Sequence, residues 1–294
     1  MTTCINYNTG QLKEAIEMFD QILTIDDTNV EALMRRAMVY LDQSNTACEA
    51  DYKRAASLAP ESPSVLYHRG QYLLLSNQPS AAADDFKKSI RCGHTSFMPY
   101  MALSHALTAL SHQKASEAQQ IKNAGSKRAK ETEAKETLEE ALSTLDDAAA
   151  KFSGVATVYV YKGQVLEQAG RAPDAEKAFK MAHKLDKTNP MPLFHLGVMA
   201  LRPTQPGNTA MLRRAVVLLE QAVKVEPQCG PALEHLGHIS LSTKDYVKAE
   251  YWFNQVLKQA KPHAIMPDQL EMMHIFKESA SMQSQLKSEG YAIV

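Results

Sequence analysis

The sequence lacks the signals that mark disulfide-stabilised, metal-binding and membrane-spanning proteins. Only four cysteines occur among 294 residues, and Cys4, Cys48, Cys92 and Cys229 show no CxxC or Cys/His ligand spacing. We therefore expect buried or idle thiols in a reducing compartment. No apolar run approaches the ~18 residues that a membrane span needs, and the N-terminus has no apolar block of a signal peptide. These absences predict a segment that is soluble by itself and does not insert into a membrane.

An excess of charge and the sequence motifs of enzymes are also missing. The formal net charge is −1, so no overall field favours anionic lipid or nucleic acid, and we expect no nucleic-acid partner. The chain contains no HExxH, GxGxxG, P-loop or GxSxG motif. Only 12 glycines and 13 prolines accompany a hydrophobic content of 45%. This composition suits an all-helical soluble protein, and because the enzyme motifs are missing we expect neither enzyme activity nor a cofactor.

What the chain does contain is a helical pattern, which is clearest in residues 156–190. Gly163 lies where one predicted helix contacts the next, and Gly170 opens a tight turn between them. In the second helix a small residue, an aromatic residue and another small residue fall at i, i+4 and i+7 on one face. The hairpin has about 34 residues, the size of a tetratricopeptide unit. Because one such hairpin cannot bury its own apolar face, it must stack on copies of itself.

The copies are present along the whole chain. The triplet reads Ala15/Phe19/Ile22, Cys48/Tyr52/Ala55, Ala82/Phe86/Ser89, Ala141/Leu145/Ala148, Ala175/Phe179/Ala182, Ala215/Leu219/Ala222 and Ala249/Phe253/Val256. The steps between its first members are 33, 34, 59, 34, 40 and 34 residues. The small residue of the preceding helix repeats as Ala37, Gly70, Ser104, Gly163, Gly197 and Gly237. These registered triplets predict an all-α fold, a right-handed superhelix (solenoid) of tetratricopeptide-type helical hairpins.

The spacing predicts three regions. Residues 1–29 form a partial repeat, the second helix of a truncated unit, as expected of the C-terminal portion of something longer. Residues 30–263 form six repeats, with a helical insertion at 109–136 that explains the 59-residue step. The insertion lengthens both helices of its hairpin into a solvated projection with a break at Gly125-Ser126, and it is either a plain surface extension or a basic docking arm. Residues 264–294 hold a C-terminal capping helix and a tail.

The first helices of the repeats supply the candidate binding surface. In such solenoids, positions 2, 5 and 9 of each unit point to the inner, concave side. An apolar groove rich in methionine and aromatic residues results, and it suits an amphipathic helix because methionine side chains adapt to many apolar partners. The candidate residues are Met34, Met38, Tyr67, Gln71, Met98, Met101, His105, Val160, Gln164, Met191, Phe194 and Val198. The alternative is that several of the methionines only fill gaps between adjacent units.

Basic residues near the groove have two open interpretations. None of the groove residues is Lys, Arg or Asn, so a clamp for the C-terminal carboxylates of chaperones is not expected. Arg36, Arg69 and Lys162 directly precede the small residue of the first helix. Since burying an unpaired charge is expensive, these head groups must either extend to the groove or meet a carboxylate such as Asp51 or Asp85.

Histidine recurs at one repeat position, as His68, His195 and His235. A metal site is a poor interpretation, because His68 lies units away from the other two and no carboxylate or cysteine accompanies them. We expect no metal.

Several segments resemble the family of seventy-kilodalton preprotein receptors of the mitochondrial outer-membrane translocase. They are LYHRGQ (66–71), DYKRAASLAPES (51–62), the enlarged third hairpin, DYVKAEYWFNQVLKQAK (245–261) and EMMHIFKESASMQSQ (271–285). The resemblance covers nearly the whole sequence. His68, Arg69, Gly70 and Gln71 match the family's motif at that place, which adds His68 and Arg69 to the predicted groove.

The resemblance implies a superhelix whose C-terminal part holds a pocket for hydrophobic internal targeting segments of mitochondrial precursors, carrier proteins among them. It also implies a location at the cytosolic face of the mitochondrial outer membrane, with other translocase subunits as partners. Family members carry an N-terminal membrane anchor and a chaperone-docking repeat domain, and neither is expected in this sequence.

The sequence therefore predicts a non-enzymatic receptor segment that binds hydrophobic or amphipathic precursor stretches transiently. The alternative is a cytosolic repeat scaffold or co-chaperone that assembles folded protein partners. A repeat domain attached to an enzyme would need catalytic sequence beyond this chain.

Overall fold

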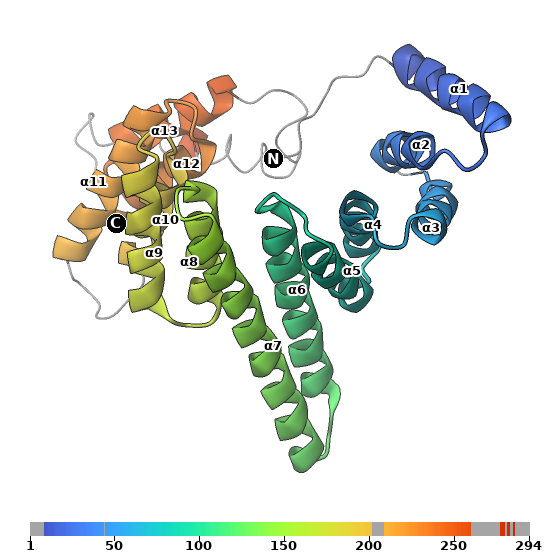
Figure 1. Cartoon of the computed structure of the whole chain (residues 1–294). Coiled ribbons are helices and arrows are strands. Elements are labelled where there is room, and N and C mark those ends of the chain that lie inside the picture. Colours follow the sequence, from blue (N-terminus) through green and yellow to red (C-terminus); the bar gives the residue numbers. More distant parts are fainter. Residues whose placement is uncertain are drawn as a thin grey trace. The chain divides into compact units, whose positions relative to one another are not determined.

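The computed structural model describes residues 9–43, 45–201, 209–259, 277–279, 281–282 and 285 (Figure 1). These residues form helices and their connections, with no strand among them, and the predicted all-α class is confirmed. The chain divides into two compact units, Met1–Ser153 and Gly154–Val294. The first unit contains α1 (Thr9–Ile25), α2 (Val30–Asp42), α3 (Cys48–Leu58), α4 (Pro63–Leu75), α5 (Pro79–Arg91), α6 (Met98–Gln120) and α7 (Ala124–Lys151). The second unit contains α8 (Ala156–Gln168), α9 (Ala172–Leu185), α10 (Met191–Leu201), α11 (Thr209–Val225), α12 (Gly230–Ser242) and α13 (Tyr246–Gln259).

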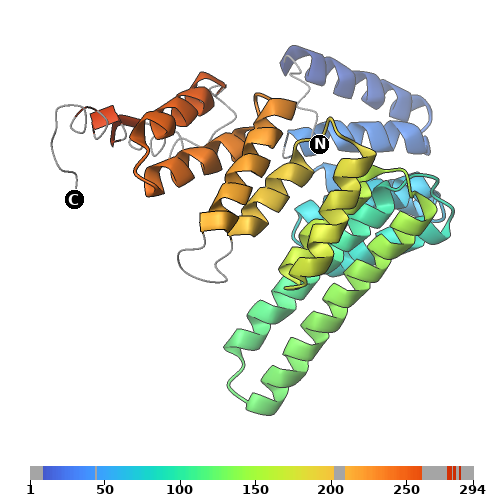
Figure 2. The same cartoon turned by 90° about the vertical axis from the view of Figure 1, so that its left-hand side faces the viewer.

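Consecutive helices pack as hairpins within each unit. The pairs are α2–α3, α4–α5 and α6–α7 in the first unit and α8–α9, α10–α11 and α12–α13 in the second. Figures 1 and 2 show the two long helices α6 and α7 lying side by side. The helix α1 packs on α2. The helical-hairpin repeats predicted from the triplets are therefore confirmed.

Each hairpin is closed by a large side chain of the second helix that packs against a small residue of the first. A Cβ atom added to Gly70 would lie 2.7 Å from the ring of Phe86, and one added to Gly163 would lie 2.5 Å from the ring of Phe179. Both rings are fully buried. Because such separations are shorter than van der Waals contact, any side chain at these glycines would displace the ring. Two more contacts follow the same rule, Gly197 with Leu219 and Gly237 with Phe253.

In the first unit an arginine also ties the two helices of a repeat together. The guanidinium of Arg36 donates to both carboxylate oxygens of Asp51, at 2.8 and 2.6 Å, and to Asp20 of α1 at 2.6 Å. Arg69 forms the same two-pronged pair with Asp85 of α5, with 2.6 Å between Nε and Oδ2. Asp51 and Asp85 are each only 5% exposed, so these carboxylates depend on their arginine partners. The predicted pairing with Asp51 and Asp85 is confirmed.

The longest hairpin is α6–α7, which contains the predicted insertion at 109–136 in its distal half (Figure 1). Small and polar side chains hold this part together: Ser111 Oγ donates to the carbonyl of Ala134 at 2.7 Å, and Ala118 is fully buried. The chain reverses at residues 121–123, where the side chain of Asn123 accepts from the backbone of Ser126 at 3.0 Å and caps α7. The break expected at Gly125-Ser126 is therefore wrong, because these residues form the first turn of the capped helix.

The structure describes the two predicted terminal regions to different extents. Within the predicted partial repeat at 1–29 the structure describes α1, in which the side chain of Ile22 is 40% exposed. The predicted capping helix and tail at 264–294 lie outside the described residues, apart from 277–279, 281–282 and 285.

Candidate functional site

The predicted groove residues of the first unit lie on α2, α4 and α6, and two of them are buried. Met34 is 5% exposed and belongs to a core cluster with Tyr52 of α3 and Val65 of α4. Tyr67 is 8% exposed, and its ring lies 5.9 Å from the ring of Phe86. We correct the expectation that these side chains face an open groove, because each one fills the space between neighbouring helices. The alternative of methionine as gap filler fits Met34.

The remaining apolar candidates of the first unit are accessible. Met38 on α2 is 36% exposed and Met98 at the start of α6 is 43% exposed. Met101 is partly buried and His105 is exposed, one turn further along α6. These side chains leave apolar surface on the first helices that another chain can cover.

A hydrogen-bonded group of side chains lies on α4. The amide of Gln71 donates to the hydroxyl of Tyr67 at 2.9 Å, and its oxygen lies 3.1 Å from Nδ1 of His68. His94, from the loop before α6, packs its ring 5.5 Å from that of Tyr67. Burial lowers the pKa of His68 and of His94, which favours the neutral imidazole, and it raises the pKa of Tyr67. The neutral imidazoles and the hydrogen bonds of Gln71 therefore hold Tyr67 and His68 in fixed positions.

Arg69 does not contribute a free cation to the surface. Its guanidinium is held by Asp85, and the pKa of Arg69 is raised by that hydrogen bond. Of the two interpretations left open for the basic residues, pairing with a carboxylate describes Arg69 and Arg36. A contact between Arg69 and a bound segment stays a prediction, with the guanidinium engaged by Asp85.

In the second unit the structure brings Gln164 of α8 to His195 of α10. The amide nitrogen of Gln164 lies 3.0 Å from Nε2 of His195, and Nδ1 of the same ring lies 3.4 Å from a carboxylate oxygen of Glu167. The imidazole also stacks on the ring of Phe179, with 4.7 Å between centroids and 5° between planes. Thus His195 is fixed from three sides and orients Gln164.

Phe194 is the central aromatic residue of the second unit's surface. Its ring packs edge to face on His195 at 5.2 Å and on His235 of α12 at 5.3 Å. Met191 and Val198 flank it on α10 and are partly exposed, as is Phe194 itself. Val160 of α8, in contrast, is 7% exposed and belongs to the core, which corrects the expectation for that residue.

Sequence reasoning missed His195, His235 and Glu167 as members of this surface. The recurrence of histidine at one repeat position is visible in the sequence, but the only site that this pattern by itself suggests is a metal site. Among the described residues no group of three or more His, Cys, Asp and Glu side chains is placed to hold a metal ion. Their role in the structure is to support Gln164 and Phe194.

Two further properties bear on function. Within the described part of the chain, no helix combines the length and the apolar character that crossing a bilayer requires. Cys48 and Cys229 are buried, and burial raises the pKa of both thiols, so they are poor nucleophiles.

Comparison with known proteins finds similarity to repeat proteins and to import receptors. A family model described as "Tetratricopeptide repeat" matches residues 128–190 and 212–265. The mitochondrial import receptor subunit TOM70 of Homo sapiens is 24% identical over 272 residues, which is 91% of this chain and 40% of the relative. Its counterpart from Rattus norvegicus is 23% identical over the same shares. The chain thus spans about 40% of the length of these curated relatives.

Solved structures agree on the fold. The crystal structure of yeast Tom70 superposes with a TM-score of 0.64 at 17% identity, over 94% of this chain and 60% of that one. The Cut9 and Hcn1 hetero-tetramer of APC/C gives a TM-score of 0.53 at 17% identity, over 95% of this chain and 51% of that one.

Proposed function

We propose that this chain, a tetratricopeptide-repeat protein related to the mitochondrial import receptor subunit TOM70, binds apolar or amphipathic segments of mitochondrial precursor proteins during import. The observation that carries the proposal is the relationship to an import receptor over 91% of the chain. We further propose that the chain works at the cytosolic face of the mitochondrial outer membrane beside other translocase subunits, and that it catalyses no reaction.

The partly exposed side chains of the first helices support this proposal physically. In the second unit Met191, Phe194 and Val198 offer apolar surface on α10 next to the fixed amide of Gln164. An amphipathic helix or an extended apolar segment gains free energy by covering these side chains, at roughly 25 cal/mol for each Å² of apolar surface removed from water. The amide donor and acceptor groups of Gln164 can then orient a peptide backbone.

The first unit offers further accessible apolar side chains, Met38 on α2 and Met98 and Met101 on α6, and the same set of first helices carries the polar side chains Gln71 and His105. Unbranched thioether side chains adapt to different apolar partners, which suits a receptor for many precursors. Because Arg69 is paired with Asp85, no arginine of this motif is available for a chaperone's carboxylate. We therefore assign chaperone docking to sequence outside this chain.

Import requires release of the precursor, so we expect micromolar affinity, on the order of −8 kcal/mol. The test is titration of a labelled, carrier-derived amphipathic peptide into the wild-type chain and into the Phe194→Glu and Met101→Glu variants. A glutamate at either position would bury a charge under an apolar ligand, so we expect at least about a tenfold loss of affinity for each.

The matched control is Val217→Glu on α11, because Val217 is 51% exposed on a second helix. Its affinity should equal that of the wild type, and circular dichroism should report the same helicity for all variants. Unchanged affinity in both the Phe194 and Met101 variants would reject these surfaces as the binding site and leave the scaffold alternative.

A further inference from the structure

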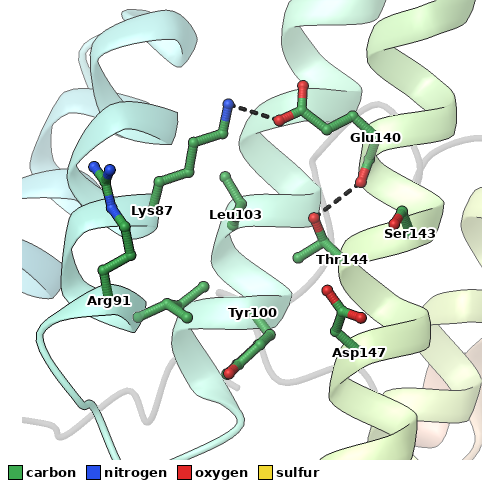
Figure 3. A pocket seen from close by; sticks show the side chains of 9 residues that line it. Lys87, Arg91, Tyr100, Leu103, Glu140, Ser143, Thr144 and Asp147 are labelled. Atoms are coloured by element: carbon green, nitrogen blue, oxygen red, sulfur yellow. Dashed lines mark hydrogen bonds and ion pairs between the residues drawn. The ribbon is translucent and has the colours of Figure 1, made fainter.

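A hollow of about 410 Å³ lies between α5, α6 and α7 of the first unit. Figure 3 shows it from close by, with Lys87 and Arg91 of α5 on one side and Glu140, Ser143, Thr144 and Asp147 of α7 on the other. Leu103 and Tyr100 of α6 lie between the two walls. The hollow opens between second helices, whereas the binding surfaces proposed above lie on first helices.

The repeat register explains why a hollow forms here. In the two preceding repeats the corresponding space holds an arginine of the first helix, Arg36 or Arg69, paired with an aspartate of the second helix. In the α6–α7 repeat these two positions are occupied by Leu103 and Thr144. Both side chains are shorter than the pair they replace, so the space is left unfilled.

The walls of the hollow carry opposite charges. Lys87 and Arg91 are one helical turn apart on α5, while Glu140 and Asp147 are two turns apart on α7. At one end the walls are already joined, with 2.6 Å between Lys87 Nζ and Glu140 Oε1. At the other end, Arg91 and Asp147 are exposed and neither has an ion-pair partner among the described residues.

The floor and the width limit what can enter. Ile90 and Leu103 give the floor an apolar character. Since the single side chain of Lys87 reaches from α5 to Glu140 of α7, the hollow is narrow enough to hold one inserted side chain rather than a whole helix. A ligand that fits has an apolar side chain between an acidic group and a basic group.

We propose that this hollow is a second protein-docking site, which takes an amphipathic helix of a partner protein. One apolar side chain of that helix enters over Leu103 and Ile90, an acidic residue contacts Arg91, and a basic residue contacts Asp147. Charges at i and i+7 with an apolar residue at i+3 or i+4 lie on one helix face, about 10 Å apart, and provide this arrangement. The site is independent of the precursor surface, because none of the proposed precursor-binding residues lines it.

The experiment uses three fluorescein-labelled, stapled helical peptides that share a central leucine and differ in the flanking charges. One carries Glu at i and Lys at i+7, one carries Glu at both places and one carries Lys at both. Fluorescence anisotropy with the full chain should show about tenfold tighter binding of the Glu/Lys peptide than of either other peptide, since each like-charged peptide replaces one attraction by a repulsion.

Substitutions identify the hollow as the place of binding. Arg91→Glu and Asp147→Lys should each remove the preference for the Glu/Lys peptide, while Lys88→Glu and Asp84→Lys on α5, outside the lining, should retain it. Leu103→Arg combined with Thr144→Asp rebuilds the ion pair of the preceding repeats and should abolish binding by filling the space. Because Leu103 is buried, the exposed Arg91 and Asp147 variants keep the test decisive if this double variant fails to fold.

Three outcomes overturn the proposal. The first is equal binding of the three peptides, or no binding of any of them. The second is a preference that survives Arg91→Glu. The third is self-association of the wild-type chain that Arg91→Glu disrupts, measured by sedimentation equilibrium, because the occupant is then a second copy of this chain. The Phe194→Glu variant should lose the carrier-derived peptide and still bind the Glu/Lys peptide at the hollow. This result would show that the two sites are independent.

Discussion

In the α2–α3 and α4–α5 repeats of the first unit the two helices are joined by an ion pair, whereas in the α10–α11 and α12–α13 repeats of the second unit the same positions are apolar. Arg36 and Arg69 pair with buried aspartates of α3 and α5. At the equivalent places of α10 and α12 stand Leu196 and Leu236, which are 7% and 1% exposed. Their partner positions on the second helices hold Leu218 and Trp252, both packed against the same core cluster as Leu236.

The difference shows that one helical hairpin can be closed by two kinds of contact. An apolar contact tolerates small displacements, but a two-pronged pair between a guanidinium and a carboxylate requires one register. The ion pair adds little net stability, because both charges lose water when they are buried. The α6–α7 repeat has neither solution, since Leu103 and Thr144 do not fill the space, and this is where the hollow forms.

The largest expected effect comes from breaking one member of a pair. Arg69→Leu should lower the free energy of unfolding by about 2–4 kcal/mol, because Asp85 remains buried without a partner. Adding Asp85→Leu should recover most of that loss, since the repeat then copies the apolar contact of the second unit. Urea unfolding followed by circular dichroism measures both. If the double variant is as unstable as the single one, the two kinds of contact are not interchangeable.

A smaller effect is expected at the close contact between a glycine of the first helix and an aromatic ring of the second helix, which both units share. Gly163→Ala in the second unit and Gly70→Ala in the first should each destabilise by about 1–3 kcal/mol, because the added Cβ overlaps the ring of Phe179 or Phe86. The control is Gly154→Ala, where a Cβ would meet no atom within 4 Å. Urea midpoints equal to that of the Gly154 variant would contradict the close-packed contact.

The second partner of Arg36, Asp20, should matter less. Asp20 is half exposed, and its contact with Arg36 is the outer one. Asp20→Ala should cost only about 0.2–1 kcal/mol, since surface ion pairs are weak and Asp51 remains to hold the guanidinium. A loss as large as that of Arg69→Leu, measured by the same urea titration, would show that Asp20 rather than Asp51 fixes the register.

The smallest expected effect depends on pH. Burial lowers the pKa of His68 below its ordinary value near 6.5, so the unfolded chain takes up the proton first. The contribution of His68 to the free energy of unfolding is therefore fully present above about pH 6.5, and it is lost as the pH falls toward the pKa of His68 in the folded chain. Gln71, Arg35, Glu31 and His94 are the polar and charged groups that act on this imidazole.

We expect the urea midpoint of the wild type to fall between pH 7.5 and pH 5.5, and we expect a smaller fall in His68→Asn. A residual slope should remain, because burial also lowers the pKa of His94. Identical slopes in the variant and the wild type would contradict the role of His68.

Much of the fold was predictable from sequence because the repeat register is local. The triplets identified Phe86, Phe179 and Phe253 as the closing side chains, and all three are fully buried. The candidate surface was only partly predictable, since exposure depends on how the next repeat packs. Position 5 of the first helix is one example, where the burial of Met34 and Tyr67 follows from contacts with neighbouring helices.

Contacts between different repeats were the hardest to predict. The link between Gln164 and His195 spans 31 residues, and no spacing rule within one helix indicates it. Glycine predicts the turn of the long hairpin at Gly125-Ser126, but the chain reverses at residues 121–123 because the side chain of Asn123 caps α7 and fixes where this helix begins. The sequence does show the change from arginine to Leu103 at this repeat position. Only the ion pairs of the two preceding repeats reveal that this change leaves a space unfilled.

The most direct test of the central claim is site-specific photo-cross-linking to a carrier-derived precursor peptide. A benzoylphenylalanine replaces Phe194 on α10 in one variant and Val217 on α11 in the other. The account predicts a cross-link from position 194 that excess unlabelled peptide removes, and none from position 217. Equal cross-linking from both positions, or cross-linking from position 217 alone, would contradict binding on the first helices.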